Sequence, residues 1–264
     1  MNLRRLALVI MFVITAGALS AAPIKLGDGL TIKPLGNGVY VVADEYPVAS
    51  NSVVVQMADS EVLVLDTPWA PAPTELLLKW IDKRFGQAKI TAINTHYHPD
   101  RLGGNAVLIA RGVPVYGSDH TARLLAEKWE PMRRTYIANS TGPIKEFYTS
   151  TYLVPPDHLF PEKDGLVLHF GEETIEVRYF GPGHTPDNLI VYCPSKKLLF
   201  CGCAIIGWEK LGNMAEADPE SWLALARKLS DYDARIVVPC HGGDSAGFSR
   251  ALLDNTIGLL SGVQ

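Results

Sequence analysis

Short runs of β-branched and aliphatic residues, broken by polar turns, dominate the chain between residues 38 and 69. The runs "VYVV" (39–42), "SVVVQM" (52–57) and "VLVLDTPW" (62–69) predict antiparallel strands joined by hairpins. Residues 72–86 then place apolar side chains at helical spacing, and Gly86 marks the expected end of that helix. The buried strand "KITAINT" (89–95), a short helix over 103–112 and the strand "VPVYGS" (113–118) follow, so strands and helices alternate.

The second part of the chain repeats this theme after a more polar, largely helical stretch. An amphipathic helix is expected over 120–138, with Pro131 as a kink or break, followed by a loop over 153–165. The remaining expected elements are hairpins over 166–180 and 188–202, an aspartate-capped helix over 218–232, a strand within 234–243 and a closing helix over 245–260. No sequence repeat is visible, but the order of elements indicates two similar α/β halves.

The N-terminal residues are typical of a secretory signal peptide. Arg4 and Arg5 precede an apolar run over 6–16, small residues follow at 18 and 20–22, and we expect cleavage near Ser20 to Ala22. The alternative is an uncleaved N-terminal anchor. We therefore expect a signal peptide over 1–22, a single exported, periplasmic domain over 23–264, and no membrane contact after cleavage, because no later run is long enough to span a bilayer.

Composition restricts the possible partners. The 264 residues carry a formal net charge of −4 and contain no basic run, which argues against nucleic acid. The length suits one large domain or two fused halves. No exposed apolar stripe is expected, so a monomer is the default prediction.

The most informative stretch is "THYHPDR", because His96, His98 and Asp100 are spaced two apart. On an extended loop such residues project to one side and can bind one ion. Three further candidate ligands each follow a predicted strand: His184, Cys203 and His241. A lone loop histidine or cysteine is usually a packing residue. The joint pattern of imidazole, carboxylate and thiolate at strand ends instead predicts a zinc site.

These segments together resemble a class B1 metallo-β-lactamase. The matching stretches run in family order: "VLVLDTPW", "THYHPDRLGGN", "GPGHTPDNLIVY", "LLFCGCAI", "LGNMAEAD" and "VPCHGG". The loop "DEYPVAS" and the helical insertion near residues 120–150 resemble the São Paulo subtype. The resemblance implies an αββα sandwich, two β-sheets flanked by helices, with two zinc ions in a groove at its edge.

The resemblance also implies ligands and an activity. His96, His98 and His184 would hold the first zinc ion, and Asp100, Cys203 and His241 would hold the second. The implied reaction is hydrolysis of the β-lactam amide of penicillins, cephalosporins and carbapenems by attack of zinc-bound hydroxide, which gives antibiotic resistance. Asp100 would orient the nucleophile, and Asn213 would assist as an oxyanion donor.

Two residues are expected to support the ligands. Asp66 ends a buried strand and is predicted to accept a hydrogen bond from a ligand histidine, fixing its tautomer. The alternative is an aspartate that caps the following turn. Arg101 is predicted to lie beneath the second zinc ion and balance its anionic ligands, the alternative being a solvated loop cation.

The loop after Cys203 departs from the family pattern. Many relatives carry a lysine that holds the substrate carboxylate where this chain has Ile206. We assign that role to Lys210, with a solvated loop lysine as the alternative. Asn213 is the expected substrate contact, or else a turn residue. Trp208 is either an apolar wall of the site or an exposed anchor.

All four cysteines lie in the last third of the chain, which indicates local roles. Cys201 and Cys240 stand where relatives usually have glycine. The two hypotheses are a Cys201–Cys240 disulfide and a pair of buried free thiols. Cys193 is expected to pack in the core.

Several residues are expected to lie outside the metal chemistry. His120, His158 and His169 match no ligand position, and Trp69 is expected to pack rather than to contact substrate. Two other functions remain open: a thioesterase or lactonase of the same superfamily, and a non-catalytic zinc-binding protein. Arg101 and Cys203 speak against the first, and the complete ligand set with Lys210 and Asn213 speaks against the second.

Overall fold

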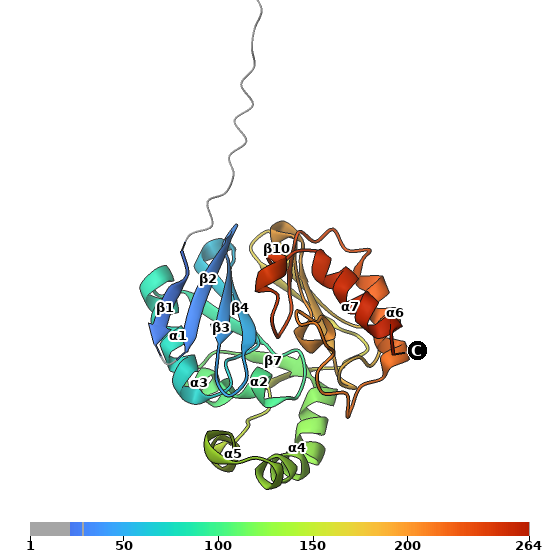
Figure 1. Cartoon of the computed structure of the whole chain (residues 1–264). Coiled ribbons are helices and arrows are strands. Elements are labelled where there is room, and N and C mark those ends of the chain that lie inside the picture. The colour runs from blue at the N-terminus through green and yellow to red at the C-terminus, as the bar shows by residue number, and fades with distance from the viewer. Residues whose placement is uncertain (1–21, 28, 264) are drawn as a thin grey trace, which may run out of the picture.

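The computed structural model describes residues 22–27 and 29–263, and two β-sheets lie face to face within them (Figure 1). The first sheet has eight strands in sequence order: β1 (Ile24–Gly27), β2 (Leu30–Gly36), β3 (Val39–Asp44), β4 (Ser50–Gln56), β5 (Glu61–Leu65), β6 (Lys89–Ile93), β7 (Val115–Ser118) and β8 (His158–Phe160). The second has five, in the order β13 (Ile236–Val238), β12 (Leu198–Phe200), β11 (Leu189–Cys193), β10 (Glu173–Tyr179) and β9 (Leu166–Phe170).

Both sheets change from antiparallel to parallel pairing partway across. Strands β1 to β5 pair antiparallel, whereas β5 to β8 pair parallel. In the second sheet β9 to β12 pair antiparallel, and β13 joins β12 in parallel. Parallel neighbours end at the same edge of a sheet, so the loops that follow β5, β6, β12 and β13 can meet.

Helices cover the outer faces of the sheets, with two more at one end. These helices are α1 (Pro71–Phe85), α2 (Pro99–Leu102), α3 (Asn105–Ala110), α4 (Asp119–Asn139), α5 (Gly142–Ser150), α6 (Pro219–Leu229) and α7 (Ala251–Ser261). Helices α1 and α3 pack on the first sheet, and α6 and α7 pack on the second. The predicted αββα sandwich is confirmed.

The apolar runs reflect this layering. In β4, Val53 and Val55 point into the core between the sheets, whereas Val54 points toward α1. Side chains on a strand alternate between its two faces, and here both faces are covered. A strand buried on both faces therefore appears as a continuous apolar run rather than an alternating one.

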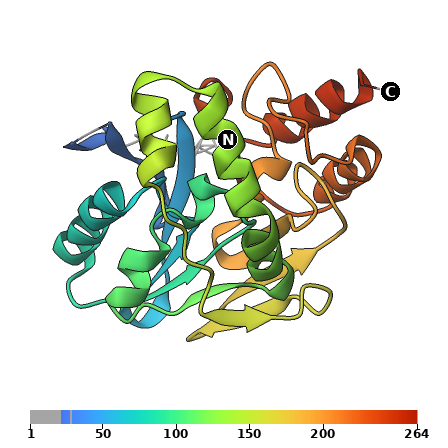
Figure 2. The same cartoon turned by 90° about the horizontal axis from the view of Figure 1, so that it is seen from below.

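Helices α4 and α5 lie at the end of the sandwich where α2 lies, and Figure 2, viewed from that end, shows them lying across the boundary between the two halves. They form an apolar cluster with Trp69, Tyr97 and Leu102. Helix α4 runs through Pro131, so the predicted break there is wrong. The helix begins at Ser118, whose side chain accepts a hydrogen bond from the Thr121 amide.

The sequence expectations missed three strands. β1 and β2 precede the first predicted strand, and β8 lies within the predicted loop over 153–165. The expected signal peptide falls, apart from Ala22, outside the described residues. Within the part of the chain that the structure describes, none of the helices combines the length and the hydropathy needed to cross a bilayer.

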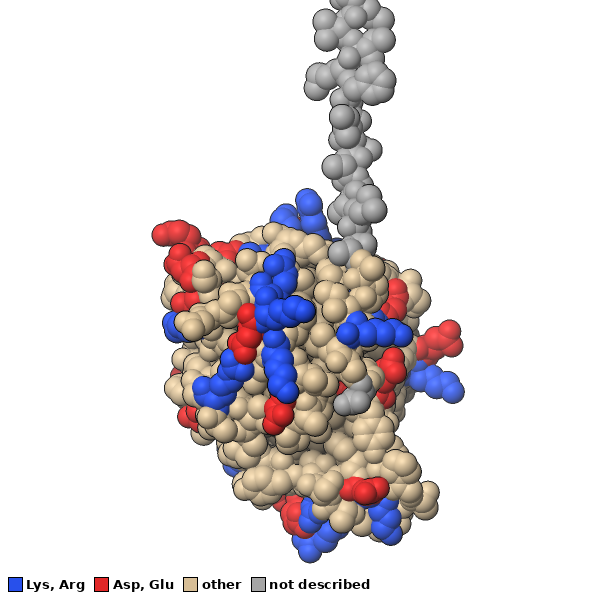
Figure 3. All heavy atoms as spheres, turned by 90° about the vertical axis from the view of Figure 1, so that its left-hand side faces the viewer, with Lys and Arg blue, Asp and Glu red and all other residues tan. Residues whose placement is uncertain are grey.

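One face of the molecule bears directly on the expected absence of nucleic-acid binding. Figure 3 shows the side on which β1 and α1 lie, where basic and acidic side chains are interspersed over a mostly uncharged surface. No continuous basic patch covers this face.

Candidate metal centre

The predicted ligands come together at one edge of the sandwich. His96 and His98 follow β6, and Asp100 lies in α2. From the second sheet, Cys203 follows β12 and His241 follows β13. His184, in the loop between β10 and β11, completes the set. A backbone hydrogen bond of 2.9 Å from the Leu189 amide to the Thr95 carbonyl joins the two halves beside them.

Three histidines form the first group, which we call the histidine set (His96, His98 and His184). Their ring centroids lie 4.9 Å (His96–His98), 5.3 Å (His98–His184) and 5.9 Å (His96–His184) apart. Nε2 of His96 and Nδ1 of His184 are buried and have no hydrogen-bond partner among the described residues. An unpaired buried polar atom is costly, and a metal ion would satisfy such a nitrogen.

Burial keeps the imidazoles of His96 and His184 neutral. It holds the pKa of His96 well below its usual value, and the neighbouring His98 lowers it further. Burial also lowers the pKa of His184 to about 3, again helped by His98. The metal-binding form of histidine is the neutral ring. His96 and His184 are therefore in the metal-binding form at neutral pH.

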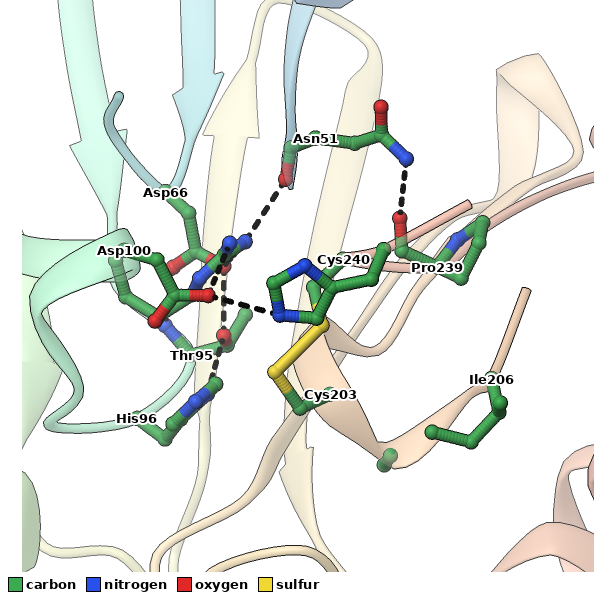
Figure 4. The surroundings of a disulfide bond; sticks show 12 residues. Asn51, Asp66, Thr95, His96, Asp100, Cys203, Ile206, Pro239 and Cys240 are labelled. Carbon is green, nitrogen blue, oxygen red and sulfur yellow. Dashed lines mark hydrogen bonds and ion pairs between the residues drawn. A yellow bond between two sulfur atoms is a disulfide. The ribbon is translucent and has the colours of Figure 1, made fainter. Parts of the chain in front are cut away.

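Hydrogen bonds fix which nitrogen of His96 is free. Its Nδ1 lies 3.2 Å from Thr95 Oγ1, and that hydroxyl donates to Asp66 Oδ2 at 2.7 Å (Figure 4). The hydroxyl proton is thus committed to Asp66, so Nδ1 is the donor and Nε2 keeps its lone pair. The predicted direct bond from a ligand histidine to Asp66 is wrong, because Thr95 lies between them.

Asp66 also accepts from the Thr95 amide at 2.7 Å. Thr95 follows β6, so this bond joins two neighbouring strand ends and does not cap the turn after Asp66. Burial raises the pKa of Asp66 to about 6, opposed by the charge of Arg101.

A second group, which we call the mixed set, consists of Asp100, Cys203 and His241. Asp100 Oδ2 lies 3.3 Å from His241 Nε2 and 2.6 Å from Arg101 Nη2. Nδ1 of His241 lies 2.7 Å from the Ala49 carbonyl and must donate to it, which leaves Nε2 to face Asp100. The mixed set brings together one carboxylate, one sulfur and one imidazole.

Arg101 is placed as predicted, beneath the mixed set and fully buried, so a solvated loop cation is excluded. It also contacts Asp66 at 3.2 Å and donates to the Asn51 carbonyl at 2.8 Å. Burial alone would raise the pKa of Asp100, but the guanidinium and His241 hold it well below its usual value. Asp100 is therefore a carboxylate at neutral pH.

The cysteines differ from both sequence hypotheses. Cys203 and Cys240 form a disulfide, whereas Cys201 and Cys193 are free and buried (Figure 4). The Cys201–Cys240 bridge is wrong, and so is the alternative of free thiols at both positions. Gly202, at φ +50°, begins a turn over Gly202–Ala204, so the chain is not extended between Cys201 and Cys203. Cys201 instead packs among the core residues under α6.

Glu216 is a site residue that the sequence analysis did not single out. Its carboxylate accepts hydrogen bonds from the Tyr97 hydroxyl, from His98 Nε2 at 3.2 Å and from Lys128 Nζ at 2.7 Å. Burial alone would raise its pKa, but these donors lower it to about 2. The charged carboxylate holds Nε2 as the protonated nitrogen of His98, which leaves Nδ1 for a metal. The feature of the sequence that could have pointed to Glu216 was its place in "LGNMAEAD", three residues after Asn213.

All residues of the two sets except the fully buried His96 line a cleft of about 260 Å³. Its walls are largely aromatic and aliphatic, including Trp69, Tyr136, Tyr148, Ile206 and Trp208. Trp208 is partly exposed and stacks on the His241 ring at 4.6 Å, so it is both an exposed residue and a wall of the cleft. Trp69 is buried but also reaches the cleft.

The two predicted substrate contacts lie in different positions. Asn213 lines the cleft, with Nδ2 at 3.5 Å from the Tyr136 hydroxyl, and Oδ1 accepts from the Ala215 amide, as a turn residue would. Lys210 is exposed and is not among the residues that line the cleft.

The donor atoms of the histidine set suit a metal ion, and those of the mixed set would do so with Cys203 as a free thiolate. Ligand atoms within 4.8 Å of one another occur in three overlapping groups: His96, His98 and Asp100; His96, His184 and Cys203; and Asp100, Cys203, Cys240 and His241. None of these groups includes His120, His158 or His169. Imidazole, thiolate and carboxylate are the ligands that zinc prefers, and the unpaired nitrogens of the histidine set fit such an ion.

The family model and the similar proteins of known name point to the same family. Residues 46–241 match the family described as "Metallo-beta-lactamase superfamily". A "Metallo-beta-lactamase type 2" from Pseudomonas aeruginosa is 31% identical over 242 residues, covering 88% of this chain and 87% of the relative. Another from Bacillus sp. (strain 170) is 32% identical over 222 residues, covering 81% and 73%.

Solved structures agree with that match. A metallo-beta-lactamase from Pontibacter korlensis superposes with a TM-score of 0.69 at 31% identity, covering 88% of this chain and 99% of its own. TMB-1 superposes with a TM-score of 0.71 at 30% identity, covering 89% and 98%.

Proposed function

The chain belongs to the metallo-β-lactamase superfamily, and from that premise we propose that it is a class B1 zinc enzyme that hydrolyses β-lactam antibiotics. The proposed substrates are penicillins, cephalosporins and carbapenems, and the consequence would be antibiotic resistance. The observation that carries the proposal is the histidine set, with its unpaired buried nitrogens, beside the mixed set at one cleft. Relatives named as β-lactamases across most of the chain support it.

Two zinc ions are proposed, one on each set. His96, His98 and His184 would hold the first, and Asp100, Cys203 and His241 would hold the second. Bound zinc would lower the pKa of a water molecule and polarise the lactam carbonyl.

The chain's own residues would orient the reaction. Asp100 is charged at neutral pH, and its carboxylate lies near ligand atoms of both the histidine set and the mixed set. It can therefore accept a hydrogen bond from the attacking water. Asn213 Nδ2, only weakly bonded to Tyr136, can turn to donate to the carbonyl oxygen as negative charge develops there. The apolar walls, Trp69 and Trp208 among them, exclude bulk water from the ring.

Lys210 is proposed to bind the substrate carboxylate. It lies in the loop that carries Trp208 and Asn213, at the rim rather than in the cleft. Substrate binding would have to bring its ammonium group over the cleft.

Further parts of the proposal rest on the sequence. The residues 1–22 would be a cleaved signal peptide, and 23–264 a single, monomeric, periplasmic domain. The loop "DEYPVAS" and the helical insertion, now seen as α4 and α5, support a relationship to the São Paulo subtype.

The test is hydrolysis of a carbapenem and a chromogenic cephalosporin by residues 23–264, first with zinc and then with chelator. The expected result is turnover that chelator abolishes and zinc restores. His96→Ala should lose turnover, whereas His169→Ala, at an exposed histidine of β9, should keep it. Two bound zinc ions without turnover would overturn the proposal and direct the search to thioester and lactone substrates.

A further inference from the structure

The sulfur atom that the mixed set needs is bonded to a second cysteine. Cys203 follows β12 and Cys240 follows β13, and these strands are parallel neighbours that align Phe200 with Val238. The two Cα atoms are 5.1 Å apart, which lies within the usual range for bridged cysteines. The bond therefore follows from the register of two core strands rather than from a loop that happens to lie near.

The backbone around both cysteines is held independently of the bond. The Cys240 amide donates to the Gly202 carbonyl at 3.0 Å, one residue before Cys203. The Asn51 amide donates to the Cys240 carbonyl at 2.6 Å. The Asn51 side chain donates to the carbonyls of Pro239 (Figure 4) and Gly242. These contacts would persist after reduction, so the two thiols would stay side by side.

A bridged sulfur and a metal-binding sulfur are mutually exclusive states. The thiolate is the form that binds a metal, and a disulfide sulfur is not a thiolate. With the bridge formed, the mixed set keeps only Asp100 and His241. With the bridge reduced, Cys203 regains its thiol, and Cys240 places a second sulfur within 4.8 Å of the other ligand atoms.

We propose that Cys240 is the redox partner of Cys203, and that exchange between their dithiol and disulfide forms decides whether the mixed set can hold its metal ion. The inference rests on the proposed assignment of Cys203 to the second zinc ion. The histidine set contains no sulfur, so its metal ion would be retained in both forms.

The exchange needs a disulfide as oxidant, either a small one such as oxidised glutathione or that of a thiol–disulfide oxidoreductase. The Cys203 thiolate attacks this disulfide, forms a mixed disulfide and releases one thiol. Cys240, as thiolate, then attacks the Cys203 sulfur, forms the bridge and releases the second thiol. Two protons and two electrons pass from the cysteines to the reagent, and two external thiols reverse the step.

Access favours this pair over the other cysteines. Cys203 lines the cleft, so a small reagent can reach it, while Cys240 is fully buried behind it. Cys201 lies in the core under α6, and Cys193 lies 3.6 Å from the Ser195 hydroxyl at the other end of β11. Neither of them lines the cleft.

The experiment measures zinc and thiols on the same samples of residues 23–264. One sample is treated with oxidised glutathione and the other with a phosphine reductant, and both are then dialysed against zinc. The reduced chain should show four thiols after denaturation in chelator, and two zinc ions. The oxidised chain should show the two thiols of Cys193 and Cys201, one zinc ion, and a linked Cys203–Cys240 peptide by mass spectrometry.

A matched pair of variants separates the partner from its neighbours. Cys240→Ala cannot form the bridge, so oxidised glutathione should stop at the mixed disulfide on Cys203, which mass spectrometry detects as a glutathione adduct in place of the linked peptide. Cys201→Ala removes an equally buried thiol two residues from Cys203, and should keep the oxidant sensitivity. The peptide measurement on the unaltered chain needs no variant, so the test stands even if Cys240→Ala does not fold.

The outcomes distinguish this inference from the proposed function. Four thiols and two zinc ions after oxidant, with β-lactam turnover intact, would overturn the redox pairing and leave the function standing. So would an oxidised unaltered chain that carries a glutathione adduct on Cys203, as Cys240→Ala is expected to, and no linked Cys203–Cys240 peptide. A reduced chain that binds no zinc would overturn both.

Discussion

The histidine set and the mixed set lie side by side but are prepared for a metal ion in different ways. In the histidine set, Thr95 fixes His96, Glu216 fixes His98, and two buried nitrogens are left without partners. In the mixed set each group already has a partner within the protein: Arg101 and His241 for Asp100, and Cys240 for Cys203.

This difference has a thermodynamic consequence. A metal ion on the histidine set satisfies nitrogens that are otherwise unpaired, so little has to be given up when it binds. A metal ion on the mixed set must compete with the bonds already present there. We therefore expect the histidine set to bind zinc more tightly, and the mixed set to respond more strongly to redox conditions.

The largest expected effect comes from breaking the histidine set. His184→Ala should lower β-lactam turnover by roughly a thousandfold or more, because metal catalysis contributes several kcal/mol and each 1.36 kcal/mol is tenfold. Zinc content should fall by one ion per chain, measured by atomic emission. His158→Ala, at an exposed histidine of β8, is the control and should change neither quantity. Full turnover by His184→Ala would contradict the assignment.

The next largest effect concerns the cation beneath the mixed set. Arg101→Ala would leave Asp66 and Asp100 buried without their counter-ion, so the free energy of unfolding should fall by about 3–5 kcal/mol. Chemical denaturation measures it. Arg111→Ala, which removes an exposed ion pair with Asp82, should cost less than about 1 kcal/mol. Equal losses of unfolding free energy in both variants would contradict the stabilising role assigned to the buried Arg101.

A smaller effect should come from the residue that orients His98. Glu216→Gln removes the charge that holds its Nε2–H, and zinc affinity of the histidine set should fall by about 10–100-fold. Competition with a fluorescent chelator measures this affinity. Glu209→Gln, at an exposed glutamate of the same connecting segment, should leave it unchanged. If the zinc affinity of the mixed set fell instead, Glu216 would support the mixed set and not the histidine set, contrary to this account.

The smallest effect is expected at the rim. Lys210→Ala should raise KM for β-lactams by up to about fivefold, the value of an exposed ion pair of at most about 1 kcal/mol. The kcat should hardly change. The difference should shrink as salt is added, because exposed charges are screened. Lys163→Ala, at an exposed lysine elsewhere, is the control. A KM that stays unchanged at low salt would remove Lys210 from the substrate site.

The sequence predicted most of the layers, because core strands such as β4, β5 and β11 carry continuous apolar runs. It missed β8, whose three residues stand in the segment "PPDHLFP", where prolines suggest a loop. It also expected a break at Pro131, although α4 accommodates this residue within its 21 residues. Local propensity gave the wrong answer where tertiary packing decided.

For the site, strand-end spacing predicted six candidate ligands, and the structure brings all six to one edge. The spacing of the cysteines did not predict which of them form the disulfide. Cys201 and Cys203 are two apart and would share a face on an extended strand, but the turn at Gly202 separates them. Thr95 and Glu216 were missed because they act through contacts with ligands rather than through a spacing of their own.

The most direct test of the account is an anomalous difference map at the zinc absorption edge from crystals of the reduced, zinc-soaked chain. The account predicts two peaks, one among His96, His98 and His184 and one among Asp100, Cys203 and His241. A single peak among the histidines, with Cys203 reduced and unliganded, would contradict the proposed two-zinc centre. Peaks away from both sets would contradict the whole assignment.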